Sequence, residues 1–237
     1  MGNRCWCADG TRGEMQPMHD MFFPMWVVKV SDFLRMKGAP EPHDVIKEHG
    51  LLCEWHPGMH VIFVSHQWLG KTHPDPQGRQ CGVLREALRR MMNRSLLVKA
   101  DPATVVSQVP STGADSILFG NHVPPLDQAY LFFDWFSIPQ GTESLKGINE
   151  QTSRFNASLA VQSLPAYVEV CTCFIALVPE LTHVETGRPC NLVSWLSRGW
   201  CRGELWCHAL SNKHGTGIVV VHSAHHVEYM VPLDWQH

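Results

Sequence analysis

The second part of the chain contains four runs of apolar residues that show no polar alternation. Such runs are typical of strands that are buried on both faces of a parallel sheet. Segments with helical spacing lie between them, so strands and helices alternate along the chain. This alternation predicts an α/β fold in which helices cover both faces of a central parallel sheet. The predicted strands cover residues 60–64, 129–135, 171–178 and 216–223, and a fifth is expected over 228–233.

Three segments between the strands have the pattern of helices. In residues 81–97, apolar positions recur at three- and four-residue spacing, and arginines occupy the opposite face. A second helix is expected over 150–169, with a break at Pro165. The third, over 198–211, carries the densest group of unusual residues in the chain and is considered below.

The first 57 residues are interpreted as an N-terminal extension of the α/β domain. Residues 1–20 have no regular pattern, whereas 25–37 and 42–52 read as two short helices. The α/β domain is expected to cover 58–237, with an inserted loop at about 98–128 that is rich in Pro, Ser, Thr and Gly. Because no helical pattern follows the last strand, we expect this domain to be truncated at its C-terminus.

Composition and charge narrow the class of protein. With 237 residues, 44% of them apolar and 17% charged, the chain can bury one sizeable core. Its net charge is −3 and its basic residues are scattered, which argues against a nucleic-acid-binding surface. The longest apolar runs are far shorter than the roughly 20 residues of a membrane-spanning helix, so no transmembrane segment is predicted.

The cysteines indicate a reducing compartment. There are nine, an odd number, and most stand in apolar segments where free cysteine behaves as a small hydrophobic residue. We therefore predict a cytoplasmic protein. Gly2 and Cys5 form a weak lipid-anchoring signal, because Trp6 stands where a myristoylation motif has Ser or Thr.

Candidate binding residues follow directly after the first two predicted strands. Ligands of open parallel sheets bind at the carboxyl ends of the strands. Ser65, His66 and Trp68 follow the first strand, and Asp134 and Trp135 stand at the end of the second. These side chains can hydrogen-bond sugars and stack on bases. The same residues could instead be loop contacts, in the case of His66 and Asp134, or core and rim residues, in the case of the two tryptophans.

The segment "SRGWCRGELWCHAL" (197–210) suggests a metal site at first sight, but helical geometry argues against one. Each residue of a helix turns by about 100° and rises by about 1.5 Å, which places Cys201 and Cys207 on different faces. Cys201 and His208 share a face but lie roughly 10.5 Å apart along the axis. Only Glu204 and His208 could chelate together, and no third ligand accompanies them. No metal is predicted, and a metal-binding domain remains a remote alternative.

Glu204 has two interpretations. It stands near the start of its helix, which favours negative charge, among neighbours that partly remove it from water and so raise its pKa. In one interpretation it is a catalytic carboxylate that faces the carboxyl end of the sheet. In the other it is structural and pairs with His208 or Arg202. The sequence leaves both open.

Three motifs in this order resemble the Toll/interleukin-1 receptor (TIR) domain family. They are "VIFVSH" (61–66), "LFFDWFSIPQG" (131–141) and "WCRGEL" (200–205), and the likeness covers roughly residues 58–233. The chain is also similar to TIR-like proteins of unicellular eukaryotes, which share "SHQWL", "HPDP" and "RGWCR". The resemblance implies a flavodoxin-like three-layer sandwich with a central parallel sheet.

The resemblance also implies two functions. Some TIR domains cleave NAD at the nicotinamide–ribose bond with the glutamate that corresponds to Glu204, and they need no cofactor beyond NAD as substrate. Others are interaction modules that assemble with one another through the loop after the second strand, here 135–146, so a homo-oligomer is expected. For the enzyme, the residues expected to bind NAD or a related nucleotide are Ser65, His66, Trp68, Asp134, Trp135, Trp200 and His208.

Overall fold

A computed structural model describes residues 19–100, 125–140, 148–211 and 217–231. The lipid-anchoring signal at Gly2 and Cys5 therefore lies outside the described residues. So do most of the expected inserted loop, the second half of the 135–146 loop and the last six residues, on which the expectation of a truncated C-terminus rests.

The fold is built on one mixed sheet of eight strands, in the order β2-β1-β5-β3-β6-β9-β10-β4. Its four central strands are parallel to one another and correspond to the four predicted apolar runs. Counted along the chain, these four strands lie in the spatial order 2-1-3-4. They are β3 (Val61–His66), β5 (Tyr130–Phe133), β6 (Cys173–Leu177) and β9 (Ile218–Ser223).

Both edges of the sheet differ from the prediction. β1 (Trp26–Lys29) pairs antiparallel with β5, and β2 (Leu52–Glu54) pairs antiparallel with β1. The helix expected over 25–37 is wrong in its first half, since only the turn α1 (Val30–Phe33) is helical. The segment interpreted as an extension thus supplies two strands of the main sheet. At the other edge, the expected fifth strand, β10 (His226–Met230), runs antiparallel to β9, and β4 (Lys99–Ala100) completes the sheet.

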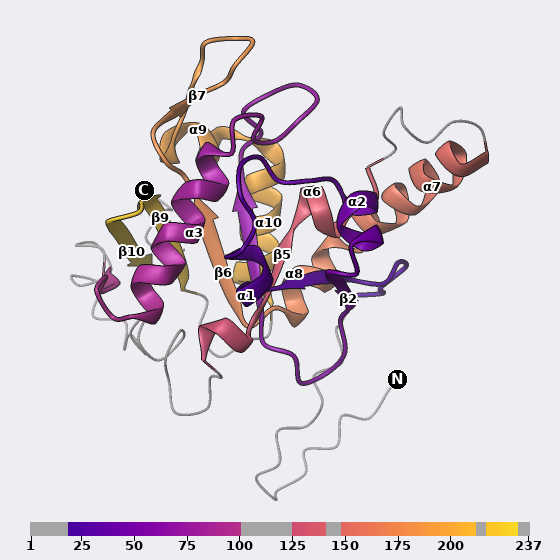
Figure 1. Ribbon diagram of the computed structural model, residues 1–237, viewed down its shortest axis with the longest axis horizontal. Helices are drawn as coiled ribbons and strands as arrows, with labels where there is room; N and C mark the ends of the chain where they lie inside the picture. The colour runs from indigo at the N-terminus through magenta and orange to yellow at the C-terminus, as the bar shows by residue number, and fades with distance from the viewer. Residues whose placement is uncertain (1–18, 101–124, 141–147, 212–216, 232–237) are drawn as a thin grey trace, which may run out of the picture.

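Helices cover both faces, which gives three layers (Figure 1). Along β3, Ile62 and Val64 pack on one face and Val61 and Phe63 on the other, so two separate apolar cores form. The first face carries α1, α2 (His43–Glu48), α3 (Arg79–Met92), the 3₁₀ turn η1 (Leu126–Gln128) and α6 (Asp134–Ser137). The second carries the C-terminal end of α7 (Ile148–Gln162), with α8 (Leu164–Val170), α9 (Leu192–Ser197) and α10 (Gly199–Leu210).

Three phenylalanines fix the register of the central strands. Phe63 stands opposite Phe132 on β5 and Phe174 on β6, with ring centroids 5.0 and 5.4 Å apart. All three are 1% exposed. Offset aromatic pairs of this kind add about 0.5–1.5 kcal/mol each to the free energy of burial. Because the register is fixed, the last residues of β3 and β5 are held side by side.

The segments that follow β5 and β6 contain elements that the sequence interpretation did not expect. The short helix α6 begins directly after β5, and a hairpin of β7 (Leu181–Thr182) and β8 (Pro189–Cys190) precedes α9. The break expected at Pro165 is confirmed, because α7 ends at Gln162 and α8 starts at Leu164.

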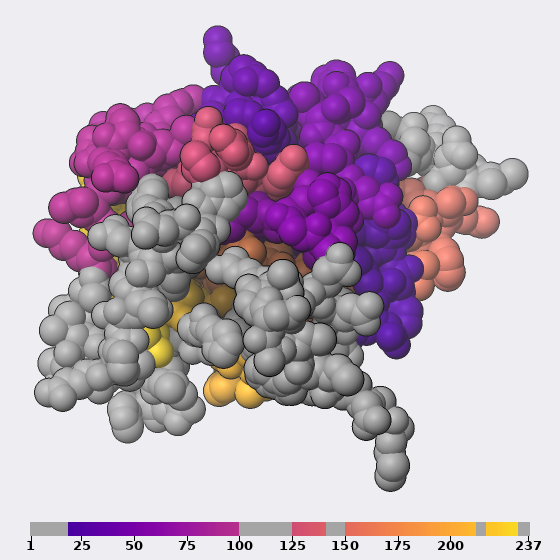
Figure 2. Space-filling model, turned by 90° about the horizontal axis from the view of Figure 1, so that it is seen from below, coloured from indigo at the N-terminus to yellow at the C-terminus, as the bar shows by residue number. Residues whose placement is uncertain are grey.

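In the space-filling view, the indigo residues of the N-terminal part lie beside salmon residues of α7 (Figure 2). Segments that are far apart in the sequence therefore share one surface of the molecule. Within the described residues, no helix combines the length and apolar character needed to cross a bilayer. The seven cysteines of the described ranges are all free thiols.

Candidate functional site

The candidate site lies where the carboxyl ends of β3 and β5 meet the start of α10. Ser65 and His66 are the last residues of β3, and Asp134 is the first residue after β5. Glu204 reaches this position from the second turn of α10. We call these four residues, together with Trp68 and Trp195, the Glu204 cluster.

Ser65 holds the carboxylate of Glu204. Its hydroxyl donates to Glu204 Oε2 at 2.5 Å and accepts from Trp195 Nε1 at 3.1 Å. Ser65 and Trp195 are 1% and 0% exposed, whereas Glu204 keeps part of its side chain open to solvent. The Trp195 N–H fixes the direction in which the serine O–H points. The carboxylate is therefore oriented by a buried relay from α9 through β3.

A second set of hydrogen bonds orients Asp134. His66 Nε2 donates to Asp134 Oδ1 at 2.8 Å, and Trp68 Nε1 donates to Oδ2 at 2.8 Å. The His66 ring stacks on Phe133 at 4.0 Å, and its side chain is 2% exposed against 30% for Asp134. His66 is thus too deeply buried to touch a ligand directly. It acts on the site by orienting Asp134.

The pKa values of Glu204 and Asp134 are shifted in opposite directions. Burial raises the pKa of Glu204 from 4.5 to about 7, and the nearby Asp134 carboxylate adds to this, while Ser65, His66 and Arg198 oppose it. For Asp134, burial would also raise the pKa, but His66 and Trp68 outweigh it and lower the pKa overall. The pKa of His66 is raised, because Asp134 more than offsets the opposing effect of burial. Asp134 is therefore ionised at neutral pH, whereas the pKa of Glu204 lies close to neutral.

The loop after β3 is tied to the helices that follow β6. Gln67 Nε2 donates to the Asn191 carbonyl and to Ser194 Oγ, both at 2.9 Å. Asn191 and Ser194 cap the start of α9 with a reciprocal pair of hydrogen bonds. The Cys201 thiol lies 3.6 Å from the His66 carbonyl. These contacts bring the loops of two neighbouring parallel strands together at one end of the sheet.

Three of the residues expected to bind a ligand lie outside the cluster. Trp135 is 5% exposed, and its Nε1 donates to the Pro40 carbonyl at 2.9 Å, so it is a core residue. Trp200 is 62% exposed on the outer side of α10. His208 is 3% exposed, with Nε2 3.2 Å from the Gly217 carbonyl and its ring packed near Phe174. The buried stripe of α10 is Cys201, Leu205 and His208, which leaves Glu204 at its edge and Trp200 outside.

Helical geometry correctly separated the cysteines of α10. Cys201 is 2% exposed and packs in the core, while Cys207 is half-buried. Across the described residues, no three His, Cys, Asp or Glu side chains are arranged as a metal site.

Sequence reasoning missed three residues of this region: Trp195, Gln67 and Arg198. Trp195 belongs to α9, a helix that was not expected from the sequence. The "NLVS" stretch (191–194) forms a reciprocal cap in the structure, so an Asn with Ser three positions later was the available signal for this helix. Nothing in the sequence marks Gln67, whose role depends on a contact 124 positions away.

Comparison with known proteins gives no match. No family model fits the sequence, and neither curated proteins nor solved structures show significant similarity to it.

Proposed function

We propose that this chain is a TIR-like signalling domain that cleaves NAD at the nicotinamide–ribose bond, with Glu204 as the catalytic carboxylate. The 2-1-3-4 order of the parallel strands supports the proposal, because it matches the start of the flavodoxin-like order. In sheets of this kind ligands bind where the strand order reverses, which here is between β3 and β6. Glu204 comes from the segment that follows β6 and contacts Ser65 of β3, whereas His66 and Asp134 join the ends of β3 and β5.

The observation that carries the proposal is the Ser65–Glu204 hydrogen bond. It fixes a partly exposed carboxylate at the carboxyl end of the sheet. Nicotinamide leaves NAD as a neutral molecule from a cationic ring nitrogen, so its departure needs no general acid. The ribose then carries oxocarbenium character, which a fixed carboxylate stabilises electrostatically. One glutamate can therefore perform the essential step without a metal or a further cofactor.

Asp134 and Trp68 take supporting roles in this proposal. Asp134 stays ionised and keeps 30% of its side chain exposed, so it can accept hydrogen bonds from ribose hydroxyls. Trp68 is partly exposed and held by Asp134, which presents its ring at the rim of the site. His66 is a positioning residue behind them.

The test is nicotinamide release from NAD by the purified chain at high protein concentration. Glu204→Gln should reduce release at least about 100-fold, as expected when a preorganised charge is removed from a transition state. Glu180→Gln, the same change at an exposed position, is the matched control and should leave release unchanged. Equal release by wild type and Glu204→Gln, or release by neither, rejects the catalytic assignment.

One observation favours the alternative, a non-catalytic interaction module. Trp206 and Leu210 stand one turn apart on one side of α10 and are 48 and 73% exposed, and Trp200, on the same helix, is 62% exposed. Large apolar side chains grouped on a surface mark interaction sites. An inactive wild type that self-associates, and loses self-association in Trp206→Ser, would support this alternative over the enzyme.

A further inference from the structure

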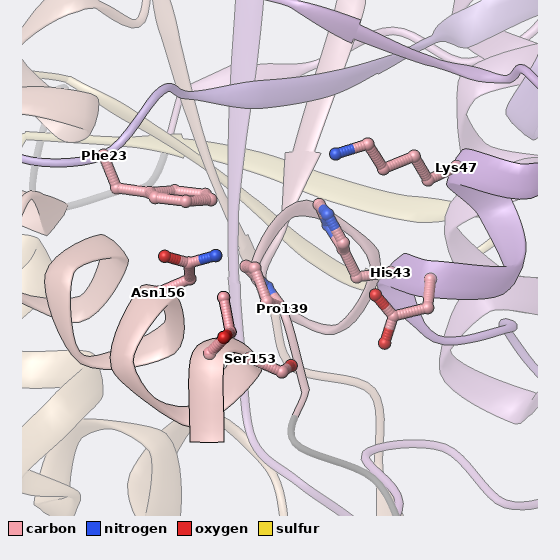
Figure 3. A pocket seen from close by; sticks show the side chains of 8 residues that line it. Phe23, His43, Lys47, Pro139, Ser153 and Asn156 are labelled. Atoms are coloured by element: carbon pink, nitrogen blue, oxygen red, sulfur yellow. The ribbon is translucent and has the colours of Figure 1, made fainter. Parts of the chain in front are cut away.

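A second site lies between α2 and α7, away from the Glu204 cluster. It is a pocket of about 240 Å³, which we call the α2–α7 pocket (Figure 3). The segment before β1, α2, the loop after α6 and α7 all contribute to it, and none of its residues belongs to the Glu204 cluster. The lining residues are Phe23, His43, Asp44, Lys47, Pro139, Thr152, Ser153 and Asn156.

Two polar atoms on opposite walls of this pocket lack partners. Asp44 Oδ2 on α2 and Ser153 Oγ on α7 are both inaccessible to water, and neither has a hydrogen-bond partner in the structure. Ser153 is 7% exposed. Buried polar groups are nearly always hydrogen-bonded, because leaving them unpaired destabilises the folded state. Asp44 and Ser153 both line the pocket, so a ligand that enters it can supply the missing partners once these two side chains turn toward it.

The other polar groups of the pocket limit the charge of that ligand. His43 is 2% exposed, and its Nδ1 lies 3.0 Å from the Phe136 carbonyl. Burial lowers the pKa of His43, so its imidazole is neutral. The Lys47 ammonium is 4.4 Å from the centre of the Trp26 ring, which it contacts as a cation. The unpaired Oδ2 of Asp44 therefore requires a hydrogen-bond donor.

The shape of the pocket indicates a flat ligand. Figure 3 shows the ring of Phe23 and the amide of Asn156 on one side, with His43 and Lys47 across from them and Pro139 between. An aromatic ring beside an amide is a combination that stacks on a heterocycle and hydrogen-bonds its edge. Pockets for drug-sized ligands measure about 300–1,000 Å³, so this smaller pocket suits one heterocycle rather than a whole dinucleotide.

We propose that the α2–α7 pocket binds a small planar heterocycle with N–H donors on its edge, of the nucleobase or nicotinamide type. Asp44 accepts an N–H of the ligand, Ser153 and Asn156 hydrogen-bond the rest of its edge, and the ring lies against Phe23. This site does not depend on the proposed NAD cleavage.

The experiment is isothermal titration of the full chain with guanosine, adenosine, cytidine and nicotinamide, each as a separate probe. At least one should bind with a dissociation constant below a millimolar. Asp44→Asn should weaken that binding about tenfold or more, and Ser153→Ala about threefold or more, because each loses a buried hydrogen bond to the ligand.

Matched controls are available on both helices. Glu48→Gln on α2 and Ser158→Ala on α7 make the same chemical changes at exposed positions, and both should bind like wild type. Glu204→Gln should also bind like wild type, which separates this proposal from the catalytic one. If Asp44→Asn does not fold, Asn156→Ala is used in its place. Asn156 is half-buried, and its replacement should weaken binding to a similar degree.

Three results would overturn the proposal. The first is that none of the four probes binds at millimolar concentration. The second is that the Asp44 and Ser153 variants bind as tightly as Glu48→Gln and Ser158→Ala. The third is that free glycine, which presents an ammonium group but no planar ring, binds better than every heterocycle.

Discussion

The Glu204 cluster and the α2–α7 pocket each contain an aspartate and a buried serine, but their hydrogen bonding is opposite. In the cluster, Asp134 accepts from two rings and Ser65 both donates and accepts. In the pocket, Asp44 Oδ2 and Ser153 Oγ have no partner. The same side chains therefore stabilise the fold in one place and destabilise it in the other. A buried polar group that lowers stability because it lacks a hydrogen-bond partner indicates a role in binding.

The largest expected effect comes from exchanging the two aspartates for asparagine. Asp134→Asn should lower the free energy of unfolding by about 3 kcal/mol, because it weakens the bond to His66 and leaves that buried ring without its counter-charge. Asp44→Asn, without ligand, should leave stability unchanged or raise it by about 1 kcal/mol. Urea denaturation of both variants measures the difference. Equal losses in the two variants would show that the pocket aspartate also has a structural partner.

The pH dependence of stability should reveal Glu204. Its pKa is about 7 in the folded protein against an ordinary 4.5, so between these values the folded protein holds a proton that the unfolded chain releases. The contribution of Glu204 to stability should therefore fall as pH rises across this window, by up to about 3 kcal/mol. His66 acts in the same direction, since its raised pKa gives stability that is complete below 6.5 and is lost as pH rises through the folded value.

Denaturation of wild type and Glu204→Gln at several pH values isolates the glutamate. The difference between the two curves gives the contribution of Glu204. In both proteins His66 adds to a decline with rising pH, whereas His43 and His60, whose pKa values burial lowers, oppose it. At the acid end, Asp134 contributes stability above 3.8 that is lost as pH falls through its lowered pKa. Parallel curves for the two proteins between pH 4.5 and 7 would contradict the raised pKa of Glu204.

Replacing Ser65 and Ser153 by alanine should give a smaller difference in stability. Ser65→Ala should cost about 1–2 kcal/mol, because the fully buried Nε1 of Trp195 loses its acceptor and Glu204 loses a donor. Ser153→Ala should change stability by less than about 0.5 kcal/mol, because it removes a hydroxyl that is already unpaired. Thermal unfolding under identical conditions compares them, and a larger loss for Ser153→Ala than for Ser65→Ala would reverse the interpretation.

A further modest effect is expected at the rim of the cluster. Trp68→Phe keeps the aromatic contact with Trp135 but removes the N–H that donates to Asp134, and should cost about 0.5–1 kcal/mol. Because the carboxylate loses a donor, the pKa of Asp134 should rise. NMR titration of the Asp134 carboxyl carbon measures this, and an unchanged pKa would mean that the hydrogen bond contributes little.

The central strands could be predicted from sequence because their apolar runs are buried on both faces, which leaves little ambiguity. β1 could not be predicted, because the spacing of apolar residues in "WVVK" does not separate a strand from a short helix. Its conformation is decided by pairing with β5, far along the chain. The α9 helix was missed because its cap lies in a segment that its Pro and Gly content marks as a loop.

For the candidate site, the grouping of Ser65, His66 and Asp134 was predictable, since the carboxyl ends of adjacent parallel strands meet at one edge. The buried face of α10 was not predictable, because residue spacing alone does not say which side of a helix packs on the sheet. Trp200 and His208, which were both expected to bind a ligand, lie on the exposed and the buried side of the helix instead. The α2–α7 pocket gave no sequence signal, since its walls come from segments about 110 residues apart.

The pairing of β1 with β5 has a consequence during synthesis of the protein. Val28 pairs with Leu131, about 100 residues later in the chain. At about 5–20 residues per second, a ribosome needs roughly 5–20 seconds to supply that partner. Throughout this interval the nascent chain carries an apolar strand whose β5-facing edge is unpaired. Growing polypeptides with such edges are substrates for chaperones, so β1 is open to them on this edge until β5 has been made.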